Sequence, residues 1–231
     1  MSFYDAIRVG ASGAVDFEVE RSLRFNDSDA PKLQRTLGSS GNRRTFTWSG
    51  WVKRSSFAHQ ALFSSTTEVG SGNSHTYLLF NSSHQLVTQS YDYSGGGTNY
   101  NLITTQVFRD PSAWYHIVYA VDTTQSTSSN RVKLYLNGEQ ITSFSTAAYP
   151  SQNYEGLINN SSYKMLMGNA FPSLSNNSPF DGYLAEATFI DGLQLTPASF
   201  AETNSETGQW VPIDTSGLTF GTNGFRLQFL D

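Results

Sequence analysis

The chain contains no cysteine. Neither a disulfide nor a thiolate metal site can therefore form, and stability must come from packing or from assembly with other subunits. The sequence also has no apolar run near the ~20 residues that a membrane span needs. The first ten residues, MSFYDAIRVG, lack the basic and apolar segments of a secretion signal. We therefore expect no membrane partner.

Charge is scarce as well. Only 14% of the 231 residues are charged, and the formal net charge is −5. A nucleic-acid groove needs clustered lysine and arginine. The one basic cluster, Arg43, Arg44, Lys53 and Arg54, is too small for that, and we interpret it as a solvated strand end. The composition thus argues against a nucleic-acid partner.

Helix signals are few, and strand signals take their place. In VKLYLNGEQI, Val132 to Ile141, apolar and polar residues alternate, and Asn137-Gly138 supply the positive φ angles of a tight hairpin turn. Similar short runs, separated by Ser, Asn, Gly and Asp, recur in QALFSS, TYLLFN, QLVTQS, AWYHIVYAVD, QITSFS, YKMLMGN, GYLAEATFIDG and GFRLQFLD. This spacing predicts an all-β sandwich or barrel.

Two strands indicate where the core lies. In RTFTWSGWVKRS, one face carries Phe46, Trp48, Gly50 and Val52, and the face predicted to meet water carries Thr47, Ser49, Trp51 and Lys53. AWYHIVYAVD is apolar on both faces, which predicts a central strand, with His116 as a hydrogen-bonded core residue. One helical turn is expected at LTPASFAETN, capped by Thr196, with Pro197 in its first position and Phe200 tucked inward.

Three long segments are predicted to be irregular loops: Gln89 to Asn101, Thr146 to Ser162 and Phe171 to Gly182. Residues 1–20 are interpreted as an extended N-terminal arm and residues 21–231 as one sandwich domain. The arm carries Phe3, Tyr4, Ile7 and Val9 before a flexible GASGA segment. We expect these apolar side chains either to dock on a partner or to pack on the sandwich.

The ordered motifs SLRFN, FTWSGWVKRS, AWYHIVYAVDTT, VKLYLNG, MLMGN and FDGYLAEATFIDG resemble the concanavalin A-like lectin/glucanase superfamily in its laminin G-like form. The resemblance implies a two-sheet antiparallel jelly-roll sandwich. ERSLRFN, RTFTWSGWVKRS and LAEATFIDGLQLTPASFAE also resemble virion proteins of tailed, particularly marine, bacteriophages. This second resemblance implies a virion protein assembled in the host cytoplasm, with other virion proteins as partners and a homo-oligomeric, for example trimeric, state.

Sugar binding needs flat aromatic rings together with amides or carboxylates. Two loops offer this chemistry, the first with Tyr91, Asp92, Tyr93, Asn99 and Tyr100, and the second with Tyr149, Gln152, Asn153 and Tyr154. The same tyrosines could instead cover the sandwich edge or contact neighbouring subunits.

Hydrolysis and metal binding have weaker signals. Glu186 is the only carboxylate between Asp181 and Asp191, so the pair of carboxylates that a retaining glycosidase needs on one strand is missing. Many laminin G-like relatives bind calcium, and Asp122 and Asp181 are the residues to test for it, although no dense carboxylate cluster surrounds them. We therefore expect no catalytic residue and no cofactor.

Three functions remain open. The first is a non-enzymatic virion protein, a tail fibre or other tail appendage, that presents the sandwich to glycans on the host surface. The second is a capsid decoration protein that stabilises the head. The third is a carbohydrate-active enzyme or a free lectin, and it ranks lowest because the acidic pair is absent.

Overall fold

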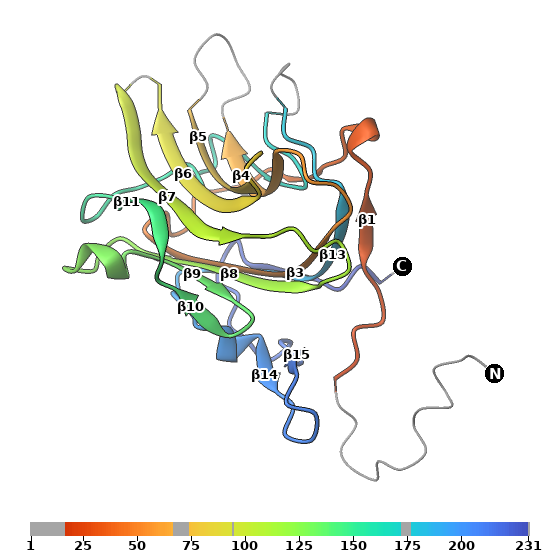
Figure 1. Ribbon diagram of the computed structural model, residues 1–231. Coiled ribbons are helices and arrows are strands. Elements are labelled where there is room, and N and C mark those ends of the chain that lie inside the picture. The colour runs from red at the N-terminus through yellow and green to blue at the C-terminus, as the bar shows by residue number, and fades with distance from the viewer. Residues whose placement is uncertain (1–16, 67–73, 94, 172–176, 231) are drawn as a thin grey trace.

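The computed structural model describes residues 17–66, 74–93, 95–171 and 177–230. Two seven-stranded antiparallel sheets lie face to face in these ranges, as Figure 1 shows, so the predicted two-sheet sandwich is confirmed. None of the helices described there has the length and apolar character to cross a membrane.

The first sheet contains the strand predicted to be central. Its order is β1 (Leu23–Phe25), β13 (Gly182–Asp191), β3 (Thr45–Arg54), β8 (Tyr115–Asp122), β9 (Val132–Leu136) and β10 (Glu139–Ile141), with β16 (Phe225–Leu227) also paired to β13. β8 lies between β3 and β9 and is buried at all but its end positions. Its placement is therefore as predicted.

The second sheet covers one face of the first. Its order is β11 (Phe144–Ala148), β7 (Gly97–Val107), β6 (Gln85–Asp92), β5 (His75–Phe80), β4 (Gln60–Thr66), β12 (Lys164–Met167) and β2 (Leu33–Arg35). The main core fills the space between the sheets, where the ring of Phe63 stacks on Trp48 and packs against Phe189, with ring centroids 6.0 and 5.6 Å apart.

The hairpin at residues 132–141 forms as predicted. Asn137 and Gly138 have φ angles of 47° and 93°, and Val132 and Leu134 are buried in the main core. The helical turn also forms, as the 3-10 helix η3 (Pro197–Ser199). Phe200 is buried, although the side chain of Thr196 makes no capping hydrogen bond.

The prediction that the second face of β3 meets water is wrong. Thr47 and Ser49 are buried, because residues 193–220, which we call the flap, fold over this side of the first sheet. The flap contains η3 and the hairpin of β14 (Ala201–Thr203) and β15 (Trp210–Pro212), and Figure 1 shows this hairpin on the side away from the second sheet. The Thr47 hydroxyl donates to the Leu193 carbonyl oxygen at 2.7 Å.

Two further expectations are corrected. The segment from Gln89 to Asn101 is not an irregular loop, because β6 and β7 extend into it and leave only a short turn between Asp92 and Gly97. Arg54 is not solvated but fully buried, with its guanidinium donating to three protein oxygens, those of Gln60 Oε1, Phe108 O and Ala58 O.

Candidate functional site

Two of the tyrosines predicted to bind sugar meet in the fold. The rings of Tyr100 and Tyr154 pack edge to face with centroids 6.1 Å apart. Tyr100 is only 3% exposed, its hydroxyl lies 2.5 Å from that of Tyr119, and burial raises its pKa well above the usual value. The two loops are thus brought together, but the ring of Tyr100 belongs to the core.

Other residues of that prediction lie nearer to solvent. Tyr93 is 55% exposed, and Asn153 is exposed at a positive φ of 61°. Asp92, Asn99 and Tyr149 are half-buried. Sugar binding at these positions stays a prediction.

Tyr91 stands in a row of stacked rings on the outer face of the second sheet. The imidazole of His75 lies between Tyr77 and Tyr91, with centroids 4.6 and 5.4 Å away, and Phe171 meets it edge-on. A sugar stacks on a free aromatic face. One face of Tyr91 is used by His75, so only its other face can stack a sugar, and sugar binding by Tyr91 stays a prediction.

The predicted docking residues of the arm, Phe3, Tyr4, Ile7 and Val9, lie outside the described residues. The described chain begins with residues 17–22, which we call the strap. The ring of Phe17 lies 5.3 Å from the guanidinium carbon of Arg226, so the strap is held against the edge of the first sheet.

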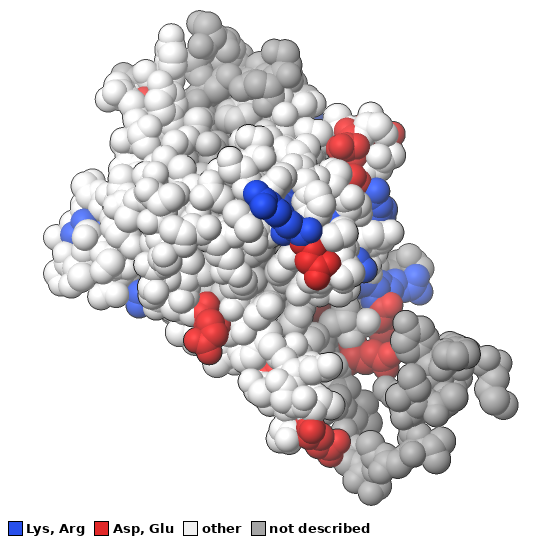
Figure 2. Space-filling view, viewed as in Figure 1, with Lys and Arg blue, Asp and Glu red and all other residues white. Residues whose placement is uncertain are grey.

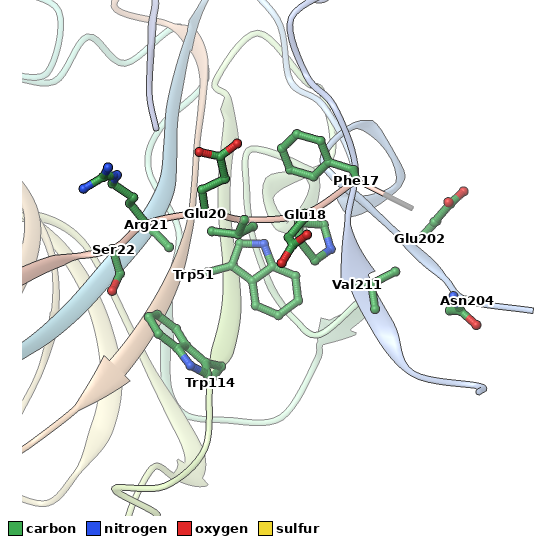
Figure 3. A pocket seen from close by; sticks show the side chains of 13 residues that line it. Phe17, Glu18, Glu20, Arg21, Ser22, Trp51, Trp114, Glu202, Asn204 and Val211 are labelled. Atoms are coloured by element: carbon green, nitrogen blue, oxygen red, sulfur yellow. The ribbon is translucent and has the colours of Figure 1, made fainter. Parts of the chain in front are cut away.

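A pocket of about 570 Å³ opens between the strap, the outer face of the first sheet and the flap hairpin. We call it the indole pocket because Trp51 and Trp114 both line it. Figure 3 shows Trp51 near its centre with Trp114 below it, Glu20 of the strap above Trp51 and Glu18 to its right, and Glu202, Asn204 and Val211 farther to the right. The remaining lining residues are Phe17, Val19, Arg21, Ser22, Ala185 and Pro212.

The position of Trp51 follows from strand alternation. It points to the outer face of β3, opposite to Trp48, and stacks on His116 with ring centroids 4.9 Å apart. The indole N–H of Trp210 donates to His116 Nδ1 at 3.0 Å, and Ser49 Oγ lies 2.9 Å from Nε2. Both ring nitrogens are therefore bonded, which confirms His116 as a hydrogen-bonded core residue.

The pocket combines apolar faces with polar groups. Trp114 is 37% exposed, a high value for an indole in a folded chain, and Trp51 is half-buried. The indole nitrogen of Trp51 is buried and has no acceptor among the described residues. Such a site can stack a ring-shaped ligand and hydrogen-bond its polar groups.

Little in the sequence indicates this pocket. Its two indoles belong to the segments RTFTWSGWVKRS and AWYHIVYAVD, which are about sixty residues apart, and its rim is completed by the strap and the flap. One available signal was Trp51, a large aromatic residue on the face of β3 that otherwise carries polar side chains.

Neither calcium candidate has a free carboxylate. Asp122 accepts hydrogen bonds from Thr45, Thr124 and Gln125. Burial alone would raise the pKa of Asp122, but these bonds outweigh it and lower the pKa. Asp181 forms an ion pair with Arg24 at 2.6 Å. Among the described residues, His, Cys, Asp and Glu side chains nowhere form a group of three or more that could bind a metal ion. The residues present do not fit a calcium ion.

The carboxylate of Glu186 also has a partner within the protein, Arg226. It lies in the bulge of β13 at a positive φ of 46°, and Arg226 Nε donates to its carboxylate at 2.9 Å. The same guanidinium donates to Asp214 at 2.7 Å. The two carboxylates are thus tied to one cation.

Comparison with known proteins identifies relatives of the fold. The sequence pattern of the concanavalin A-like lectin/glucanase superfamily matches residues 27–199. No curated protein matches the chain.

Three solved structures illustrate how distant the similar folds are. The Ruminococcus gnavus IT-sialidase CBM40 bound to α2,3 sialyllactose is 16% identical, with a TM-score of 0.48 over 67% of this chain and 88% of that one. The heptameric SAP-like pentraxin from Limulus polyphemus is 13% identical, with a TM-score of 0.48 over 88% and 96%. The tailspike protein 2 enzymatically active domain of bacteriophage CBA120 is 11% identical, with a TM-score of 0.49 over 78% and 26%. Because each of these TM-scores is below 0.5, the structural similarities support no conclusion about the ligands or the function of this chain.

Proposed function

The chain belongs to the concanavalin A-like lectin/glucanase superfamily, and we propose that it is a non-enzymatic bacteriophage virion protein that binds glycans of the host surface. Superfamily membership supports the fold but does not fix the function, since one fold serves many functions. The proposal therefore depends on particular residues.

The observation that supports glycan binding best is the indole pocket. Trp114 offers an exposed ring, and Trp51 offers a second, half-buried ring beside it. Glu202 and Asn204 line the pocket across from the strap and can bond sugar hydroxyls. Aromatic stacking with a few directional polar groups is the chemistry that a sugar ring requires.

The state of Glu186 supports a non-enzymatic role. Retaining hydrolysis needs one free carboxylate as nucleophile and a second carboxyl that can give up a proton. Glu186 and Asp214 instead share Arg226, and hydrogen bonds from Ser216, followed by the contact with Arg226, lower the pKa of Asp214. A lowered pKa is the opposite of what a general acid needs.

The virion location is supported by the sequence resemblance to tailed-phage proteins in ERSLRFN, RTFTWSGWVKRS and LAEATFIDGLQLTPASFAE. We place the chain on the tail, in contact with other virion proteins and as a homo-oligomer. Sedimentation of the purified protein should show a species larger than the 25.5 kDa chain. A monomer at micromolar concentration would count against self-assembly.

A glycan array tests the binding function. Wild-type protein should bind at least one class of bacterial surface glycan, and Trp114→Ala should remove that binding because it deletes the exposed ring. Tyr93→Ala tests the tyrosine loop in parallel, since Tyr93 is the more exposed aromatic and lies outside the pocket. Binding that survives Trp114→Ala would place the site elsewhere, and loss with Tyr93→Ala would point to the tyrosine loop.

A further inference from the structure

We propose that the indole pocket selects glycans that carry a free amino group, such as a hexosamine without its N-acetyl group. This inference rests on the proposed glycan binding and adds the class of sugar. It follows from the charge on the pocket rim and from the faces of the indoles.

The rim is acidic. Three carboxylates line the pocket, Glu18 and Glu20 from the strap and Glu202 from β14, against a single cation, Arg21. Figure 2 shows acidic side chains next to the grey atoms at the right of the view, with basic side chains adjoining them. Glu20 and Glu202 are exposed and have no ion pair within the described ranges. These two carboxylates are therefore available to a bound cation.

The indoles favour the same charge. An ammonium group is attracted to the negative face of an aromatic ring, and tryptophan gives the strongest attraction. Trp51 and Trp114 lie beside each other, with the carboxylate of Glu18 next to Trp51 and the side chain of Glu20 above it (Figure 3). A protonated amine bound there would meet aromatic faces and carboxylate oxygens together, each of which stabilises positive charge.

The indole N–H of Trp51 is buried and has no acceptor among the described residues, so a ligand in the pocket meets the ring of Trp51 rather than this donor. The polar side chains that line the pocket include Asn204 and the carboxylate of Glu202. An ammonium group pairs with carboxylates, and the hydroxyls of a sugar both donate and accept hydrogen bonds. An amino sugar therefore combines the charge that the rim attracts with a ring that can stack on an indole.

Other sugar classes fit the rim less well. An acidic sugar would be repelled by the exposed carboxylates of Glu20 and Glu202. An N-acetylated sugar keeps the ring and the hydroxyls but has no charge for the carboxylates to pair with. The comparison between free and acetylated amine therefore isolates the proposed selectivity.

The test is calorimetric titration of the full chain with the glucosamine tetramer and with the N-acetylglucosamine tetramer, at a pH where the free amine is protonated. We expect the glucosamine tetramer to bind roughly tenfold more tightly, the effect of a few partly exposed charge pairs. The preference should shrink at about 1 M salt, where the Debye length is about 3 Å.

Variants connect the preference to the rim. The double variant Glu20→Gln, Glu202→Gln should lose the preference but keep binding through the indoles. Glu206→Gln removes an exposed carboxylate from the turn of the same hairpin that does not line the pocket, and it should retain the preference. Trp114→Ala should remove binding of both sugars.

The outcomes separate the two proposals. Equal or tighter binding of the N-acetylated tetramer, abolished by Trp114→Ala, would overturn the amine selectivity and keep the glycan function. A preference that persists in the double variant would also overturn the rim as its source. Binding of both sugars that Trp114→Ala leaves intact would overturn the pocket as the site, and with it this inference.

Discussion

At the scale of single residues, His116 decides how the flap is attached to the first sheet. Trp210 donates to Nδ1, so the ring proton must sit on Nε2, where Ser49 Oγ can accept it. Burial lowers the pKa of His116 to about 3. Protonation at Nδ1 would remove the acceptor of the Trp210 indole, so the neutral ring is required for the anchor.

This residue should make the protein sensitive to acid. In the unfolded chain His116 takes up a proton near its ordinary pKa of about 6.5, while in the folded chain it stays neutral down to about pH 3. Its contribution to stability is therefore complete above about pH 6.5 and falls as the pH drops, by up to ~1.4 kcal/mol per pH unit for one proton. Urea unfolding measured at several pH values checks this slope.

The variant His116→Gln should flatten that slope, because glutamine does not titrate and can still bond Trp210 and Ser49. His84→Asn removes a half-buried histidine outside the flap and tolerates its positive φ of 65°, so it serves as the control. Equal slopes for His116→Gln and the wild type would exclude His116 as the acid-sensitive group.

At the scale of elements, the alternation of apolar and polar residues predicts those features that a single strand or hairpin determines by itself. The core face of β3 and the β9–β10 hairpin follow directly from their residue patterns. β7 was missed because Asn99 and Asn101, residue types that are rare in strands, occupy alternate positions beside buried Tyr100 and Leu102. Pairing with β6 and β11 on either side outweighs that low propensity.

The turn of that hairpin carries an element-scale prediction. Gly138 has a φ of 93°, and a Cβ there would lie 3.1 Å from the ring of Trp210. Gly138→Ala should therefore lower the free energy of unfolding by about 1 kcal/mol or more. Gly217→Ala, where a Cβ meets no atom within 4 Å, should have little effect. Equal losses in chemical denaturation would contradict a specific role for the turn.

At the scale of the whole molecule, the sandwich could be predicted from sequence, but the covering of its outer face could not. Nothing local to Thr47 and Ser49 shows that a segment about 150 residues later will bury them. The indole pocket depends on the same long-range packing, since it needs the strap and the flap together. The tyrosines of each loop, in contrast, are close together in the sequence, so their pattern is visible without the fold.

Stability should not depend on a divalent metal. The carboxylate of Asp122 accepts hydrogen bonds from Thr124 and Gln125, and the carboxylate of Asp181 is paired with Arg24. Calcium would have to compete with these partners for the carboxylate oxygens. We expect the same melting temperature with EDTA and with added calcium. A rise in melting temperature on adding calcium would reveal binding to the folded state and would contradict this reading of both carboxylates.

The central claim is that this sandwich is displayed on a phage particle as a glycan-binding protein. The most direct measurement is electron microscopy of purified particles labelled with an antibody against residues 21–231. We predict label at the tail. Label spread over the head would contradict the tail position and favour capsid decoration, and particles without label would contradict the virion role itself.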